Sequence, residues 1–298
     1  NESTASIAKN ITFDLTKPKF TQVLPLASSR INTQTVEWNV DEPLQSGKYT
    51  WIHMGGEADP NAPHEFSLSN DLLKPGKGDN SKLPPLDLVV DAMYRITLEG
   101  TDLAGNTGKK FIMSVVYDNL PPQLELKYPL SNSAVNHLDI SYSLNEQLSI
   151  GQIIYSRVGG EPDPNSPVTL ELVGNELETN FDTPQTTSKP PVLNDGSIYN
   201  IQFKGSDLAT NSSESNIIEN VKYDITRPKI TIFYPSSNSY FMGSNISIDI
   251  SEDLKDGRMV WTRTGGLNDN VTKHFIPLYD QYLKKGKYEN ANVPVQES

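Results

Sequence analysis

The sequence predicts an all-β protein made of antiparallel two-sheet sandwiches that follow one another in tandem. The first observation is an internal repeat: residues 117–124 return as residues 223–230, and both match residues 13–20. The matches recur at steps of about 105 residues, the ordinary size of one folding domain. The second observation is hydrophobic alternation with a period of two, while no long stretch has a helical period. Each copy should therefore contain about seven short strands separated by turns.

The expected strands follow one another in the same order in each copy. The inward-facing residues of the first copy should be Phe20 and Leu24, then Val36, Trp38 and Val40, then Tyr49 and Trp51, then Tyr94, Ile96 and Leu98, and last Val115 and Tyr117. The later copies have apolar residues at the corresponding positions, among them Leu124, Leu126 and Tyr128 after one linker and Ile230, Ile232 and Tyr234 after the next. Such alternation is typical of strands with one buried face.

The repeat divides the chain into four segments. We expect residues 1–17 to be the last strand and linker of a preceding repeat, residues 18–120 and 121–226 to be complete repeats, and residues 227–298 to be an incomplete one. The parent protein should therefore be longer than this chain. Tandem copies of a domain usually add length, stiffness or valency, whereas a catalytic site is normally built once.

Composition excludes several classes of protein. The chain has no cysteine, so neither disulfides nor thiolate chemistry are expected. Its formal net charge of −12 argues against a nucleic-acid partner, because phosphate binding needs clustered Lys and Arg. No run of about 18 apolar residues is present, so no membrane segment is expected. Acidic composition of this kind suits solubility and divalent cations.

Two motifs give the chain a family resemblance. The turn Asp102-Leu103-Ala104-Gly105-Asn106 and the linker motif Tyr-Asp-x-x-x-Pro are similar to those of bacterial immunoglobulin-like repeats in large surface adhesins and extracellular stalk proteins. The resemblance covers the whole chain and implies immunoglobulin-like sandwiches in an extracellular or cell-surface protein. The chain departs from antibody domains in lacking an intersheet disulfide, and the second copy has Thr210 where the first has Gly105.

Acidic residues recur at three places in the repeat: the linker, the end of the second strand, and the turn between the sixth and seventh strands. In an immunoglobulin-like sandwich these three places lie at the pole where the chain enters, so the carboxylates should converge and need a cation between them. Oxygen ligands of this kind favour Ca²⁺ over the smaller Mg²⁺. The candidate ligands are Asp14, Glu42, Asp102 and Asn106 at the first joint, Asp118, Glu146, Asp207 and Asn211 at the second, and Asp224 and Glu252 at the third.

A plain turn is the alternative explanation of the Asp-x-Ala-Gly-Asn motif. Asp and Asn are favoured in turns because their side chains bond to the local backbone, and Gly105 suits a positive φ. The recurrence of Glu42 and Asp14 in step with the turn favours the calcium hypothesis, since a turn alone requires neither residue.

Other recurring features are best explained by structure. The loops that contain Asp59 and Asp163 have the Gly, Pro and Asn residues of any tight connection, although each could also carry a ligand beside Trp51 or Tyr155. These aromatic residues are expected in the core. The four histidines lack paired zinc spacing, and the recurring acidic pair at a joint leaves no cleft for a glycosidase substrate.

These observations predict a non-catalytic segment of a long extracellular bacterial protein, a calcium-stiffened stalk or filament that supports adhesion. Its partners would be neighbouring repeats and identical chains in a fibre. Two alternatives stay open. The repeats could bind a glycan or a host surface protein, or they could polymerise by strand exchange through the unpaired strand expected in residues 1–17.

Overall fold

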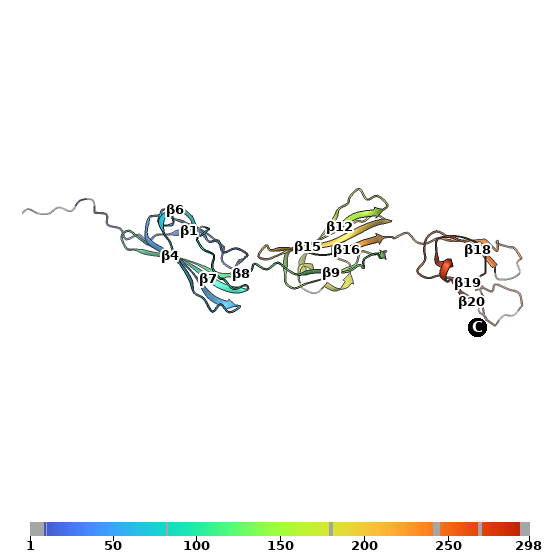
Figure 1. The fold of residues 1–298 in the computed structure, drawn as a ribbon. Helices are drawn as coiled ribbons and strands as arrows, with labels where there is room; N and C mark the ends of the chain where they lie inside the picture. Colours follow the sequence, from blue (N-terminus) through green and yellow to red (C-terminus); the bar gives the residue numbers. More distant parts are fainter. Residues whose placement is uncertain are drawn as a thin grey trace, which may run out of the picture. The chain divides into compact units, whose positions relative to one another are not determined.

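The computed structural model describes residues 9, 11–81, 83–178, 181–240, 245–267 and 270–292. The chain divides into two compact units, Asn1–Asp224 and Ile225–Ser298. Strands and turns make up the fold, and its helical segments are 3-10 turns of four residues (Figure 1). Within the described residues, no helix is long and apolar enough to cross a membrane. The all-β prediction is confirmed.

The first unit begins with a sandwich of two sheets. The smaller sheet has the order β1 (Phe20–Leu24), β3 (Glu37–Val40), β6 (Gly76–Asp79). The larger has the order β2 (Arg30–Ile31), β8 (Thr107–Tyr117), β7 (Ala92–Asp102), β4 (Leu44–Gly56), β5 (His64–Ser67). A 3-10 turn, η1 (Asn70–Leu73), leads into β6. Neighbouring strands are antiparallel except β2 and β8, which pair in parallel.

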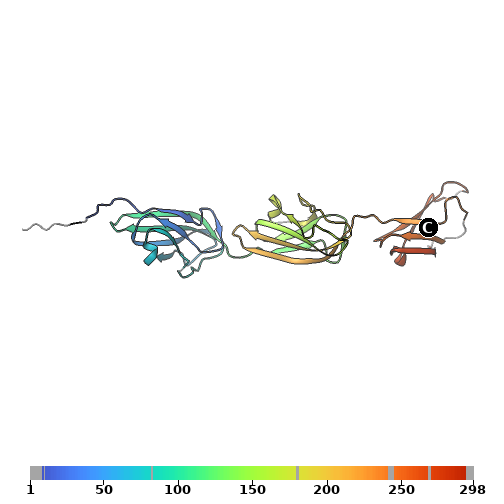
Figure 2. The same ribbon diagram turned by 90° about the horizontal axis from the view of Figure 1, so that it is seen from above.

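A second sandwich in the same unit repeats this topology. Its smaller sheet has the order β14 (Phe181–Gln185), β11 (Ile140–Leu144), β9 (Leu124–Tyr128). Its larger sheet has the order β10 (Ala134–Val135), β16 (Ser212–Tyr223), β15 (Ser197–Asp207), β12 (Leu148–Gly160), β13 (Val168–Glu171), with η2 (Gly174–Leu177) before β14. The parallel pair recurs between β10 and β16. Figure 2 shows the strands of both sandwiches from a second direction.

Each of these sandwiches has eight strands among the described residues, where about seven were expected, and hydrophobic alternation does not locate all of them. The alternation pattern misses β2 and β10 because each has only two residues. It also misses β6, whose sequence Gly-Lys-Gly-Asp offers no apolar face. These strands are held by ladder pairing to a neighbour and leave little trace in hydrophobicity.

The described residues of the second unit form two sheets. One has the order β17 (Ile230–Tyr234), β18 (Asn245–Ile250), β21 (Gly286–Asn292), and the other pairs β19 (Arg258–Thr262) with β20 (Lys273–Pro277). The turn η3 (Asp280–Leu283) precedes β21. The domain boundaries expected from the repeat stay a prediction, although separate hydrophobic clusters form within residues 20–117, 124–223 and 246–291.

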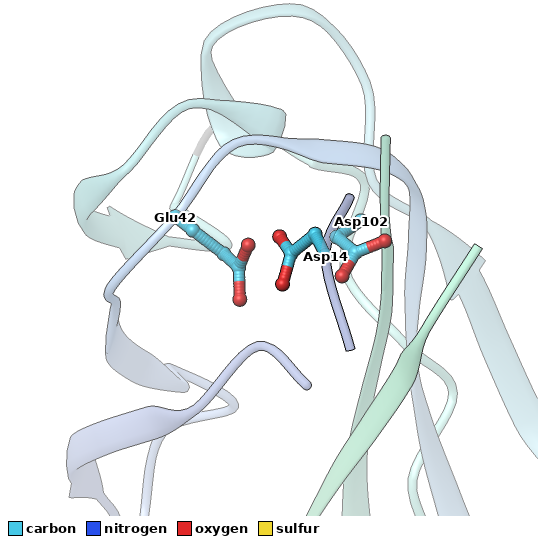
Figure 3. Close-up of side chains that lie close together, drawn as sticks. All are labelled: Asp14, Glu42 and Asp102. Carbon is cyan, nitrogen blue, oxygen red and sulfur yellow. The ribbon is translucent and has the colours of Figure 1, made fainter. Parts of the chain in front are cut away.

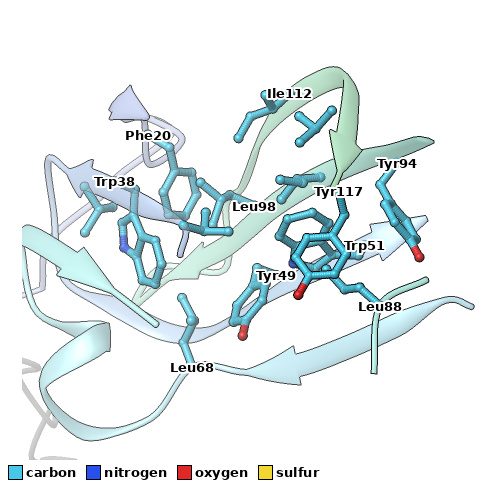
Figure 4. Close-up of a cluster of buried hydrophobic side chains, with 14 of the residues drawn as sticks. Phe20, Trp38, Tyr49, Trp51, Leu68, Leu88, Tyr94, Leu98, Ile112 and Tyr117 are labelled. Atoms are coloured by element: carbon cyan, nitrogen blue, oxygen red, sulfur yellow. The ribbon is translucent and has the colours of Figure 1, made fainter. Parts of the chain in front are cut away.

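The core of the first sandwich is rich in aromatic side chains. Trp38, Tyr49, Trp51 and Tyr94 are at most 1% exposed, and their rings pack between the two sheets (Figure 4). Trp51 meets Tyr94 edge-on, with ring centroids 5.6 Å apart. The prediction that the third-strand aromatics belong to the core is therefore confirmed for Trp51, and Tyr155 occupies the corresponding buried place in the second sandwich.

Some predicted core positions are wrong. Leu24 is 44% exposed because the register of β1 against β3 shifts between Thr21 and Leu24, which breaks the alternation. Ile230, Ile232 and Tyr234 are also exposed. In the two sandwiches of the first unit, β7 and β15 cover the start of the first strand: a Cβ on Gly100 would lie 2.9 Å from Phe20, and one on Gly205 would lie 3.3 Å from Leu124. The described residues of the second unit include no counterpart of that strand.

Candidate metal centre

Three carboxylates from separate segments meet at the linker end of the first sandwich. Asp14 lies in the linker before β1, Glu42 in the turn between β3 and β4, and Asp102 at the end of β7. One oxygen of each lies within 4.8 Å of the others. Figure 3 shows the Asp14 carboxylate between those of Glu42 and Asp102. The sandwich topology thus brings together the three acidic residues predicted for the first joint.

The Asp102 carboxylate is fixed by the turn that follows it. Its Oδ1 accepts hydrogen bonds from the backbone N–H of Ala104 at 2.8 Å and of Asn106 at 2.9 Å. Its Oδ2 accepts one from the Asn106 amide at 2.8 Å. Gly105 has a φ of 94°, a conformation that costs glycine little. The motif is therefore a side-chain-stabilised turn, as the alternative reading expected, and the turn aims its carboxylate at the cluster.

Asn106 joins this turn to the linker. Its amide Nδ2 also donates to the backbone carbonyl of Asp14 at 3.1 Å. The asparagine thus holds the linker beside Asp102 through its amide nitrogen. A ligand role for Asn106 stays a prediction.

The second sandwich repeats the arrangement. Asp118 in the linker, Glu146 between β11 and β12, and Asp207 at the end of β15 place one oxygen each within 4.8 Å of one another. Asp207 Oδ1 accepts hydrogen bonds from the N–H groups of Ala209 at 2.8 Å and Asn211 at 2.9 Å. The Asn211 amide donates to Asp207 Oδ2 at 2.8 Å and to the Asp118 carbonyl at 2.9 Å. Thr210 stands where the first copy has Gly105 and adopts a φ of 72°, so the turn keeps its conformation without a glycine.

Linker docking recurs at the start of the first strand of each sandwich. The N–H of Lys19 donates to Asp41 Oδ1 at 2.7 Å, and the N–H of Gln123 donates to Asn145 Oδ1 at the same distance. Each acceptor directly precedes the cluster glutamate in sequence. The linker therefore reaches its cluster along a path held by hydrogen bonds.

Burial and mutual repulsion set the proton affinity of the clustered carboxylates. Burial first, and then the charges of Asp14 and Asp102, raise the pKa of Glu42. Burial, with Asp118 and Asp207 beside it, likewise raises the pKa of Glu146. A raised pKa means that the charged form lacks compensation, which a bound cation would supply.

Asp118 of the second cluster and Asp102 of the first differ in their surroundings. Burial raises the pKa of Asp118, whose side chain is only 4% exposed, and the charges of Asp207 and Asp91 add to the effect. Burial also acts on Asp102, but the hydrogen bonds from Asn106 and Ala104 outweigh it and lower its pKa. Asp102 is thus stabilised as a carboxylate by the protein itself.

The remaining predicted residues, Asp224 and Glu252, lie in different compact units. Asp224 forms an ion pair with Lys222 at 2.6 Å. Oε1 of Glu252 is shielded from solvent and has no hydrogen-bond partner among the residues that the structure describes. Their role as a third site stays a prediction.

The chemistry of the donors fits a hard divalent cation. Each complete cluster offers three carboxylates. Backbone N–H groups and an asparagine amide orient the aspartates of each cluster without neutralising them. Carboxylate oxygens are the ligands that Ca²⁺ prefers, and its tolerance of irregular geometry suits a site assembled from a linker and two turns.

Sequence reasoning placed Asp59 and Asp163 in structural loops but did not predict that their side chains are buried. Asp59, in the loop after β4, accepts hydrogen bonds from Tyr94 Oη at 2.7 Å, His64 Nε2 at 2.6 Å and the N–H of Asn61 at 3.0 Å. Asp163 is held in the same way by Tyr199 Oη at 2.6 Å. These contacts agree with the reading of the loops as structural connections. The recurrence of Asp with the tyrosine of the sixth strand is the signal that could have revealed them.

Comparison with known proteins gives distant structural neighbours. No protein-family model matches the sequence, and no curated protein matches it. The chain is similar to the fibronectin(III)-like modules of CbhA from Clostridium thermocellum, with 10% identity, a TM-score of 0.34, and coverage of 70% of this chain and 94% of that one. It is also similar to a 1.5-MDa bacterial ice-binding adhesin, with 12% identity, a TM-score of 0.30, and coverage of 89% and 84%. Likeness at these values carries no function over to this chain.

Proposed function

We propose that this chain is a non-catalytic structural segment of an extracellular bacterial adhesin or stalk, in which Ca²⁺ bound at the linkers stiffens successive sandwiches. The sequence resemblance to adhesin repeats and the tandem organisation support the structural role. The net charge of −12 suits a protein that works in the presence of divalent cations.

The carrying observation is that the linker itself contributes a carboxylate to each complete cluster. Asp14 and Asp118 belong to the segments that enter the sandwiches, whereas the other two acidic residues of each cluster belong to the sandwich. A cation bound by all three would tie the linker to two turns of the following sandwich. The linker would then lose freedom of rotation, so a hinge would become a stiff joint.

Calcium titration into the full chain, followed by thermal unfolding with calcium and with chelator, tests the proposal. We expect about one ion per complete cluster and a clear rise in melting temperature, because a ligand that binds only the folded state stabilises it. At a free concentration 100 times the Kd, the gain is about 2.7 kcal/mol per site. Small-angle scattering under both conditions should show a narrower range of chain dimensions with calcium.

Substitution at one cluster gives the matched control. Glu146→Gln keeps the length of the side chain and removes its charge, so it should abolish or weaken uptake at the second cluster by at least about tenfold and spare the first. Glu219→Gln removes the same charge at an exposed position on β16 and should change neither site. Absence of uptake, or equal uptake by all three proteins, would refute the metal sites. Uptake without a change in chain dimensions would refute stiffening.

A further inference from the structure

Each sandwich of the first unit is followed by a linker that contains an aspartate. This aspartate forms an ion pair with a basic side chain of the sandwich that precedes it. Arg30, on β2, lies 3.5 Å from Asp118 Oδ2 and 3.2 Å from Asp91 Oδ1. Lys222, on β16, lies 2.6 Å from Asp224 Oδ2. Each ion pair joins the end of one sandwich to the segment that enters the next.

The two basic residues occupy one ladder position on opposite strands. In the parallel pair of the first sandwich, Arg30 stands opposite Val116. In the second sandwich, Ala134 stands opposite Lys222. The basic residue has therefore exchanged strands while its aspartate partner has stayed in place. Two different residues that make the same contact indicate that the position requires a positive charge beside the linker aspartate.

We propose that this basic side chain is a tethered counter-ion that competes with the divalent cation for the linker aspartate and so sets the calcium concentration at which each joint stiffens. The inference rests on the proposed metal site and adds its regulation. Without a bound cation, the linker aspartate would then be held by its ion pair with the preceding sandwich.

The surroundings of Asp118 favour such a competition. A cavity of about 280 Å³ is lined by Arg30, Asp91, Asp118 and Glu146, among others, so the guanidinium and the cluster face one space. Arg30 is 39% exposed along its side chain and has room to leave, whereas the 4% exposed Asp118 does not. Arginine keeps its charge at every physiological pH, so the counter-ion is always present.

The first cluster provides an internal reference. Among the described residues, no Lys or Arg side chain forms an ion pair with Asp14. Removing Arg30 should therefore change the second cluster and leave the first as it was. Calcium should also reach the first cluster at a lower concentration than the second, because it does not have to displace a positive charge there.

Calcium titration of the full chain carrying Arg30→Ala tests the inference. We expect one site to tighten by about threefold to tenfold, the range for loss of a partly screened charge, while the other stays unchanged. Lys48→Ala is the matched control. It also removes one positive charge, but from an exposed ion pair with Glu65 on the sheet. Arg30→Gln, which keeps more of the side chain, should reproduce the tightening, and Arg30→Lys should restore the natural affinity.

The outcomes separate this inference from the proposed function. If the natural chain binds calcium and Arg30→Ala, Arg30→Gln and Lys48→Ala all bind it equally well, the counter-ion is refuted and the metal site stands. If the chain takes up calcium only after Arg30 is replaced, the counter-ion is supported and the proposed function of the natural chain is refuted. If neither the natural chain nor any variant takes up calcium, both are refuted.

Discussion

At the scale of single residues, the buried tyrosine–aspartate pairs decide how the long loops of the larger sheets are fixed. Asp59 and Asp163 are at most 9% exposed, yet their loops lie at the ends of long strands where backbone is usually mobile. The hydroxyl groups of Tyr94 and Tyr199 donate hydrogen bonds to these carboxylates. They also accept hydrogen bonds from the backbone N–H groups of Val89 and Asn194, respectively. One phenol thereby ties two loops together.

Tyr94→Phe should lower the stability of the first sandwich by about 1–3 kcal/mol, because the buried Asp59 carboxylate loses a donor and the N–H of Val89 loses its acceptor. Denaturant unfolding of the full chain measures the loss. Tyr199→Phe should act alike in the second sandwich. Its loss should be the larger of the two, because Asp59 keeps the 2.6 Å contact from His64 whereas the second sandwich has Val168 at that position. A loss under about 0.5 kcal/mol in both variants would contradict this account.

At the scale of elements, the linker and the last strand of the first sandwich approach so closely that only glycine fits between them. A Cβ on Gly108, at the start of β8, would lie 1.9 Å from the backbone oxygen of Pro18. At the corresponding place in the second sandwich, the Ser213 hydroxyl donates to the backbone oxygen of Pro122. In the first sandwich, Gly108 lets the backbone of the last strand contact the linker directly. In the second, a hydrogen bond from Ser213 joins the last strand to the linker.

Gly108→Ala should therefore displace the linker at the first sandwich. We expect a loss of about 1–3 kcal/mol from overpacking and weaker calcium binding at the first cluster, because Asp14 lies on the displaced segment. Ser213→Ala removes only the hydroxyl and should cost about 1 kcal/mol without steric conflict. Equal calcium affinity of Gly108→Ala and the natural chain at the first cluster would show that the linker is not held by this contact.

The sequence alone predicted the strands in which apolar and polar side chains alternate. It missed the strands that are held mainly by backbone hydrogen bonds to a neighbouring strand. Trp38 and Trp51 could be placed in the core because strict alternation surrounds them. Leu24 could not, because a register shift leaves no mark in the sequence. The carboxylate clusters were predictable since topology fixes where the second and sixth strands end. Arg30 and Lys222 were missed because they stand on different strands and do not align in the repeat.

At the scale of the whole molecule, negative charge is concentrated where the two sandwiches of the first unit begin. The chain has a formal net charge of −12, and its two complete clusters place three carboxylates each at a linker. Charge held in this way lowers stability unless a proton or a cation binds. The same residues should therefore couple stability to pH and to calcium together.

In chelator, stability should fall as the pH rises above the ordinary titration range of carboxylic acids, about 4. Glu42, Glu146 and Asp118 have raised pKa values, so the stability that they contribute is present when they are protonated and is lost as the pH rises through those values. Asp102 has a lowered pKa, so its contribution disappears only at more acidic pH and does not offset this loss. Calcium replaces the missing protons, so the rise in melting temperature that it causes should be larger near pH 7 than near pH 5. Melting curves at both pH values measure this difference, and Glu146→Gln should reduce it because one of the three groups no longer titrates. An equal calcium effect at both pH values would contradict the coupling between calcium binding and the protonation of the clustered carboxylates.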